Sequence, residues 1–392
     1  MTASDKSVLS RKFAPELDVL RGMAAVLMIV NHAGYRLLSA QDALHSAVSP
    51  WVFLGSFAPA VFFFATGLGI GLSRSVEPRP FDWAGVLWKA ALLIVADQFF
   101  FWGKGVGLGL DFFSFIAIAT VCVSLLSRLR RAVSVCISLA ALLLLTRYGF
   151  GPWWGAPQHY LPIFEWMLGV RGTAEISYPL SPWMLFPLLG FACGVAYQSV
   201  SLSLPVPRNT WLQRGAAVAT FFFAIALVLL LLNRSFFRWG TVSISYLALA
   251  MAVVTTVGLL SMAAVMYGKR IPNALALRGV ASFAVIPLHY AVLAAIVELV
   301  PQPLSPWPFL LVVACVICAT FFGAAKFAEH AWRVASEAPQ TLLFSLLVVG
   351  VFIFGLAIYF SLLSSWIPSA LITLLAQLCI AVLLGMRLPT KT

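Results

Sequence analysis

Charged residues are scarce in this 392-residue sequence: they make up 10% of the chain, whereas soluble domains carry roughly 25%. Hydrophobic residues reach 62%, so most of the protein surface must face lipid and not water. The 13 acidic residues are outnumbered by 25 Lys and Arg, which gives a net charge of +12. These basic residues recur between apolar stretches and do not gather in one segment. The pattern excludes a soluble domain and argues against a nucleic-acid partner.

Cysteine is also scarce. All six cysteines lie inside apolar stretches, and the pair Cys315 and Cys318 has no second CxxC beside it. Thiols that face lipid or lie buried in the helix bundle are therefore predicted, with no role in metal binding or redox chemistry. A cleavable signal peptide is not expected either, because the first apolar run is long, contains Arg21 and lacks a small-residue cleavage site.

Long apolar runs dominate what remains. A membrane-spanning helix needs about 20 mostly apolar residues. Twelve windows meet this need, at 17–38, 52–73, 84–102, 111–127, 132–147, 181–199, 214–232, 242–266, 279–300, 306–327, 341–363 and 367–387. We therefore predict an all-α, polytopic transmembrane helix bundle. It divides into a cytoplasmic tail (1–13), a core of ten spans (14–330) and two accessory spans (331–392), which we expect to face lipid or form a homodimer contact.

Basic residues also predict the orientation. With a cytoplasmic N-terminus, seventeen of the 25 Lys and Arg residues face the cytoplasm, six face the other side and two lie within spans. Such an excess on one side indicates that both termini are cytoplasmic. The segment 148–180 then lies outside. Its residues Trp153 and Trp154 are either interfacial anchors or a surface on which a sugar ring stacks.

The first span carries ionisable residues, which are costly within a membrane and therefore suggest function. His32 follows Arg21 by 11 residues, or three helical turns plus about 20°, so both side chains lie on one face and roughly 16 Å apart along the axis. Asp18 lies beside Arg21, one turn earlier. Arg21 paired with Asp18 and a buried, hydrogen-bonded His32 are the structural alternatives. Because both residues share one face, we favour a functional role.

Two segments then resemble a known family. The stretch LDVLRGMAAVLMIVNH, followed by FAPAVFFFATGLGIGLSR, is similar to the transmembrane acyltransferase superfamily. The Arg-x10-His spacing is matched by Arg21 and His32, and a Phe-Phe-x-x-Thr-Gly pattern ends at Thr66 and Gly67. The segment around Pro182 and Trp183 resembles the heparan-α-glucosaminide N-acetyltransferase-like branch. We favour this branch over the acyltransferase-3 branch.

The resemblance implies a membrane enzyme that takes an acyl group, commonly acetyl, from cytoplasmic acyl-CoA. The group passes to a sugar or other cell-envelope acceptor across the membrane, and the bacterial members imply an inner-membrane location. His32 would act as the base or carry the acyl group, since histidine ionises near neutral pH. Arg21 would bind the polyanionic donor. The other donor-site candidates are Arg74, Lys89, Arg278, Thr66 and Gly67.

Other candidates depend on weaker signals. In the eukaryotic pattern an asparagine takes the place of His32 and a histidine of the next loop is catalytic, so His45 is an alternative. A late signature ends at His289, where Pro287 is expected to interrupt the helix and kink the span. His289 then either lines the site or caps a broken helix. The acceptor candidates are Asp97, Asp111, Asn31, Trp153 and Trp154.

A proton-coupled transporter or lipid flippase is the alternative function, because buried Arg, His and Asp residues also suit proton transport. The sequence shows no internal repeat in support of it. A scaffolding membrane protein is a third possibility, but it would not need a charged first helix.

Overall fold

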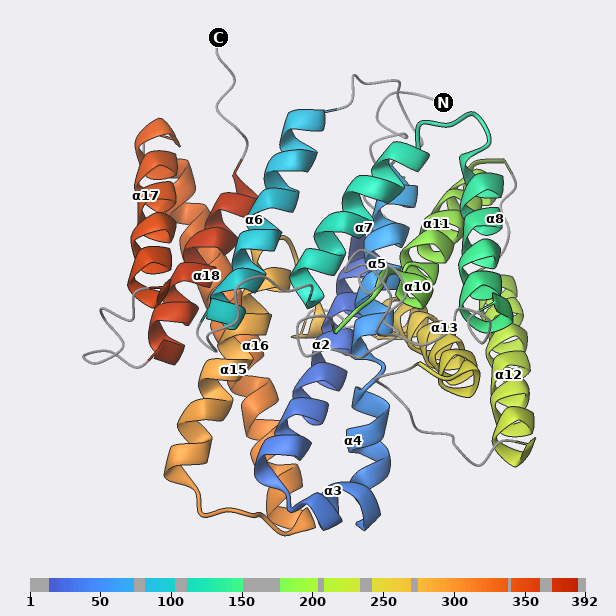
Figure 1. The fold of residues 1–392 in the computed structure, drawn as a ribbon, viewed down its shortest axis with the longest axis horizontal. Helices are drawn as coiled ribbons and strands as arrows, with labels where there is room; N and C mark the ends of the chain where they lie inside the picture. The colour runs from blue at the N-terminus through green and yellow to red at the C-terminus, as the bar shows by residue number, and fades with distance from the viewer. Residues whose placement is uncertain are drawn as a thin grey trace. The chain divides into compact units, whose positions relative to one another are not determined.

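The computed structural model describes residues 14–73, 82–102, 111–150, 177–203, 208–232, 242–268, 274–337, 340–359 and 369–386. These residues form helices and connecting turns, with no strand among them (Figure 1). The helices are α2 (Ala14–Leu37), α3 (Ala40–His45), α4 (Ser49–Gly55), α5 (Ala58–Ser73), α6 (Trp83–Trp102), α7 (Phe112–Leu126), α8 (Ala132–Leu144), the π-helical turn η1 (Leu145–Phe150), α10 (Leu180–Trp183), α11 (Leu185–Ser203), α12 (Arg208–Leu232), α13 (Ile244–Tyr267), α15 (Val280–Leu299), α16 (Pro306–Glu337), α17 (Gln340–Tyr359) and α18 (Ser369–Gly385).

Each of the twelve predicted windows overlaps at least one of these helices. Within the described residues, eight helical segments are long and apolar enough to cross a membrane, and three shorter apolar helices accompany them. Large apolar side chains remain exposed on the outer helices, as at Phe221, Leu231 and Leu232 of α12, where lipid can cover them. The protein is therefore an all-α polytopic membrane protein, as the sequence predicts.

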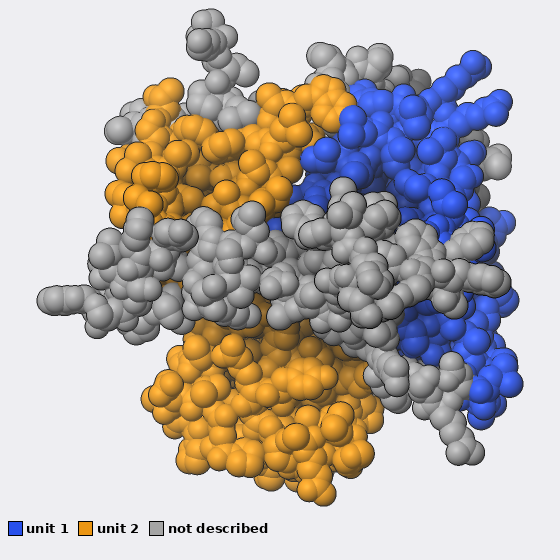
Figure 2. All heavy atoms as spheres, viewed as in Figure 1, with its two compact units in different colours: residues 1–23, 59–81, 110–276 blue, residues 24–58, 82–109, 277–392 orange. Residues whose placement is uncertain are grey.

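The chain divides into two compact units (Figure 2). Unit 1 comprises residues 1–23, 59–81 and 110–276, and unit 2 comprises residues 24–58, 82–109 and 277–392. The helix α2 contributes its first residues to unit 1 and the remainder to unit 2. Each unit is described by itself below.

Unit 1 contains a close contact between α5 and α11. A Cβ atom at Gly67 of α5 would overlap the backbone of Pro187, and one at Gly190 of α11 would overlap the backbone of Phe64. Gly71 and Gly194 repeat the contact one turn further along each helix. Small residues four apart let membrane helices approach closely, so Gly67 and Gly71 of the second predicted span serve helix packing.

An aromatic cluster fills the centre of unit 1. Trp183, which is 1% exposed, contacts Tyr178 with ring centroids 5.2 Å apart and Phe63 at 5.9 Å. Phe63 also packs on Phe115 at 4.1 Å. The Pro-Trp segment singled out in the sequence therefore forms part of a buried core.

Unit 2 is built around α15, which packs against α16 and α18. The helix α18 also packs against α6, where the buried amide of Gln377 donates to the carbonyl of Ala96 at 3.1 Å. Ala376 and Ile380 of α18 are fully buried. The prediction that both C-terminal spans face lipid or a second copy is therefore wrong for α18, which belongs to the packed interior of unit 2.

Candidate functional site

Two imidazoles meet in unit 2. His32 of α2 and His289 of α15 lie 257 residues apart in sequence, yet Nδ1 of His32 is 2.9 Å from Nε2 of His289. Their centroids are 5.1 Å apart and their planes 21° apart, so the two rings meet edge to edge and nearly coplanar. His289 is fully buried, whereas His32 is partly exposed. We call these two residues the histidine pair. The pair thus combines one enclosed imidazole with one that is partly exposed.

Tyr290 and Arg36 extend the histidine pair. The Tyr290 ring stacks on His32 with centroids 5.0 Å apart and lies tilted against the His289 ring at 4.2 Å. The Arg36 guanidinium lies 5.8 Å from the Tyr290 ring centroid. A guanidinium over a tyrosine face is an attractive arrangement. Sequence reasoning missed both residues, although Arg36 is one helical turn after His32 and Tyr290 directly follows His289.

Hydrogen bonds hold the end of α2 that carries His32. The Asn31 side-chain amide donates to the carbonyl of Val52 on α4 at 2.9 Å, and the backbone N–H of Leu304 donates to the carbonyl of Leu37 at 2.7 Å. Asn31, predicted to bind the acceptor, therefore uses its amide N–H to join α2 to α4. Its role toward an acceptor remains a prediction.

His289 lies within an intact helix. The helix α15 continues from Val280 to Leu299 with Pro287 inside it, and His289 is its tenth residue. The ring nitrogen Nδ1 of His289 is 3.2 Å from the carbonyl of Val285, one turn earlier. The expectation that Pro287 interrupts the helix is wrong, and so is the alternative that His289 caps a broken helix, whereas the expected kink stays a prediction. His289 instead contacts His32.

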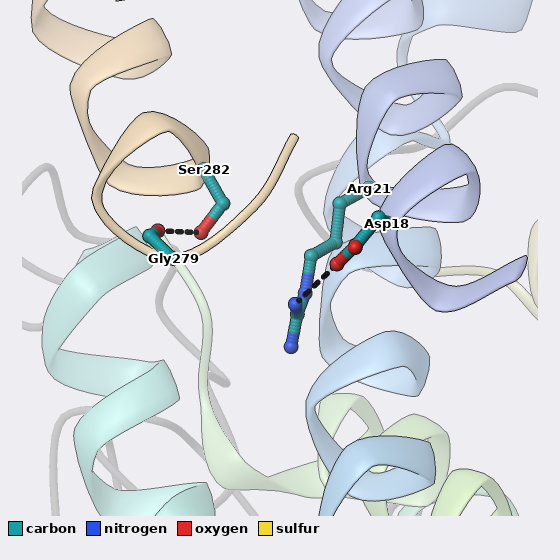
Figure 3. A network of polar contacts seen from close by, with 4 residues as sticks. All are labelled: Asp18, Arg21, Gly279 and Ser282. Carbon is teal, nitrogen blue, oxygen red and sulfur yellow. Dashed lines mark hydrogen bonds and ion pairs between the residues drawn. The ribbon is translucent and has the colours of Figure 1, made fainter. Parts of the chain in front are cut away.

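Arg21 and Asp18 form the predicted pair in unit 1. Nη1 of Arg21 donates to Oδ1 of Asp18 at 3.4 Å (Figure 3). The Asp18 side chain is 9% exposed, and the Arg21 side chain is 29% exposed. A guanidinium has five N–H donors, and within the described residues Asp18 is the hydrogen-bonding partner of Arg21. The remaining donors are available to an anionic ligand.

The other predicted donor-site residues have different surroundings. Thr66 donates its hydroxyl to the carbonyl of Phe62 at 3.0 Å, and Gly67 sits in the contact between α5 and α11. The side chains of Lys89 and Arg278 are exposed. Arg74 lies outside the described residues. Helix packing thus accounts for Gly67 without a ligand, and the donor-binding roles stay predictions.

Predicted acceptor residues are also dispersed along the chain. Asp97 of α6 is 1% exposed and belongs to unit 2, whereas Asp111 directly precedes α7 in unit 1. Trp153 and Trp154 lie outside the described residues.

Figure 3 shows one further polar contact, in unit 2, where the Ser282 hydroxyl donates to the carbonyl of Gly279 at 2.8 Å.

His45, the alternative catalytic histidine, is the last residue of α3 and its side chain is exposed. Within the described residues its imidazole makes no hydrogen bond to another side chain, in contrast to His32. The part of the chain that the structure describes also holds no group of three His, Cys, Asp or Glu residues suited to a metal ion. Of the two histidines considered, His32 is the one that contacts a second imidazole.

The arrangement of the histidine pair suits proton transfer. The partly exposed His32 can exchange a proton with a bound molecule, and the buried His289 fixes the orientation of the His32 ring through their hydrogen bond. This is the organisation of a general base with an orienting partner.

Comparison with known proteins identifies the family. No curated protein and no solved structure matches the chain. The sequence profile described as "Heparan-alpha-glucosaminide N-acetyltransferase, catalytic" matches residues 14–214, which is just over half of the chain. The matched region includes Asp18, Arg21, His32 and His45 and ends before His289. The chain therefore belongs to the heparan-alpha-glucosaminide N-acetyltransferase catalytic family, and its function is of the membrane acetyltransferase type.

Proposed function

We propose that this protein transfers an acetyl group from acetyl-CoA to a sugar acceptor of the cell envelope, with His32 as the base. The histidine pair carries this proposal, because it supplies a partly exposed imidazole whose orientation is set by a second, buried imidazole. The family supports acetyl transfer, and its description names an amino sugar as the acceptor.

The chemistry needs one base and one proton. His32 takes the proton of the acceptor hydroxyl or amine as the acceptor lone pair attacks the thioester carbonyl carbon. The carbon–sulfur bond then breaks, the sulfur leaves with the bonding electrons as a thiolate, and the protonated His32 returns the proton to it. The products are the acetylated acceptor and free CoA, with no other reactant needed.

Arg21 supports binding of the donor. CoA carries several phosphate charges, and guanidinium groups bind phosphate oxygens through paired N–H donors. Arg21 has donors beyond the one that contacts Asp18, and it shares α2 with His32. The basic excess at the predicted cytoplasmic ends of the spans would attract the same polyanion. The donor is therefore proposed to enter from the cytoplasm.

The acceptor side is proposed to be the opposite face of a bacterial inner membrane, so that the protein acetylates an envelope glycan. The amino sugar in the family description makes N-acetylation the first reaction to test. Asp97, Asp111 and Asn31 remain the proposed acceptor-binding residues of the described chain, with Trp153 and Trp154 beyond it.

The test uses purified protein in detergent with acetyl-CoA and methyl α-glucosaminide as the probe acceptor. Release of the CoA thiol and appearance of the N-acetylated sugar should rise together. His32→Ala should lower the rate by about 100-fold or more, since general bases contribute about 10²–10⁴-fold. The matched control is His330→Ala, because His330 is an exposed histidine on α16.

Three outcomes would count against the proposal. The donor is wrong if millimolar acetyl-CoA neither stabilises the protein against heat nor is consumed. The base is wrong if His32→Ala retains full activity, and loss of activity in His45→Ala alone would move the role to His45. The fold of each variant is checked by gel filtration.

A further inference from the structure

Each hydrogen bond of the histidine pair needs one donor and one acceptor, which fixes where the protons lie. Nε2 of His289 faces Nδ1 of His32 at 2.9 Å, and Nδ1 of His289 faces the carbonyl of Val285 at 3.2 Å. A carbonyl oxygen can only accept a hydrogen bond, so Nδ1 of His289 must carry the proton. In a neutral imidazole the other nitrogen then has only a lone pair.

The position of the proton on His289 determines the position of the proton on His32. Since Nε2 of His289 is an acceptor, Nδ1 of His32 must donate to it and must carry a proton. The remaining nitrogen of His32, Nε2, is therefore unprotonated. We infer that His289 is a positioning residue that holds His32 in the Nδ1–H tautomer and leaves Nε2 as the basic atom. The catalytic consequence rests on the proposed function, but the tautomer itself does not.

The surroundings favour a neutral pair that can accept one proton. Two protonated imidazoles could not share the 2.9 Å hydrogen bond, because neither facing nitrogen would have a lone pair. The Arg36 guanidinium, which lies over the neighbouring Tyr290, adds a positive charge to the cluster. When Nε2 of His32 takes a proton, the His32–His289 bond becomes charge-assisted and stronger. His289 thus stabilises the cation that forms during transfer without moving its own proton.

The tautomer can be observed without any activity. Protein labelled with ¹⁵N-histidine gives separate NMR signals for protonated and unprotonated ring nitrogens, and the His32 signals are those lost in His32→Gln. The inference expects a protonated Nδ1 and an unprotonated Nε2 for His32 in the wild-type protein at neutral pH. A protonated Nε2 on His32 in the wild-type protein would overturn it.

Two substitutions of His289 distinguish the effect of its hydrogen bond on His32 from the effect of its ring volume. His289→Phe keeps an aromatic ring against Tyr290 but removes the acceptor, so His32 should lose its fixed tautomer in the NMR spectrum. His289→Gln offers an amide oxygen as the acceptor in the same region, so the Nδ1–H tautomer should return. The inference fails if the Phe variant, still folded by gel filtration, keeps the wild-type His32 signals.

Kinetics add a second readout. His289→Phe should lower kcat of acetyl transfer by about 100-fold with little change in KM for acetyl-CoA, and His289→Gln should recover to within about tenfold of wild type. An unchanged kcat in the Phe variant overturns the positioning role. If the expected tautomer is seen but no acetyl transfer is found, the proposed function fails and the tautomer assignment stands. If the Phe variant does not fold, the wild-type spectrum alone decides.

Discussion

Gly67→Ala should destabilise unit 1, because the contact between α5 and α11 leaves no room for a methyl group. The added Cβ would overlap the carbonyl group and Cα of Pro187, which are backbone atoms and cannot rotate aside. The two helices must separate along the contact that Gly71, Gly190 and Gly194 share. Separation loses van der Waals packing, which is a main source of attraction between helices in a membrane.

The expected magnitude follows from two opposing effects. Overpacking of a tightly packed site costs about 1–3 kcal/mol. The higher helix propensity of alanine returns at most about 1 kcal/mol. Because the obstacle at Gly67 is backbone, the cost should lie at the upper end, and the net loss should be about 2 kcal/mol. That is a factor of ~30 in the ratio of folded to unfolded protein.

The assay is an SDS titration in mixed micelles, with unfolding followed by helical circular dichroism. Gly258→Ala is the matched control, because a Cβ at this helical glycine of unit 1 has no atom within 4 Å. Gly190→Ala, which alters the other helix of the same contact, should lose as much as Gly67→Ala. The reasoning is refuted if Gly67→Ala and Gly258→Ala unfold at the same SDS fraction.

Two further predictions concern unit 2. Gln377→Ala should cost about 1–2 kcal/mol of stability in the same titration, because it leaves a cavity and removes the hydrogen bond to Ala96. Gln377→Met fills the space and loses only the hydrogen bond, so it should cost about 0.6 kcal/mol. Equal losses in the two variants would show that the hydrogen bond dominates. Glu329 forms exposed ion pairs with Lys326 at 2.9 Å and Arg333 at 3.7 Å. Exposed ion pairs contribute little to stability, so Glu329→Gln should leave the unfolding midpoint unchanged, and a clear shift would contradict this.

The helices of this fold could be predicted from the sequence because lipid imposes a simple rule. A segment that crosses a membrane must be apolar over about 20 residues, and this length is visible without any tertiary information. Hydropathy does not reveal which helices pack together. The burial of α18 was therefore missed, although the polar Gln377 within an apolar run is a signal of a helix interface.

In the candidate site, too, local features could be predicted from the sequence and long-range contacts could not. The alignment of Arg21 with His32 and the pairing of Arg21 with Asp18 depend only on helical periodicity, and the structure has one continuous helix, α2, over these residues. The contact between His32 and His289 joins residues 257 positions apart, so no local period could predict it. Pro287 led to a wrong prediction of an interrupted helix. A membrane helix tolerates a proline where neighbouring helices and side chains satisfy the backbone groups that the proline frees.

The composition of unit 2 from early and late parts of the chain has a consequence for biogenesis. Synthesis proceeds from the N-terminus, so every segment of unit 1 has been made by residue 276, whereas α15 and α18, which pack together, follow later. A nascent chain that has just passed residue 214 contains the whole family-matched region but not His289. His32 then has no imidazole partner. The histidine pair can form only in a nearly finished protein, so a prematurely terminated product would carry the family signature without the assembled site.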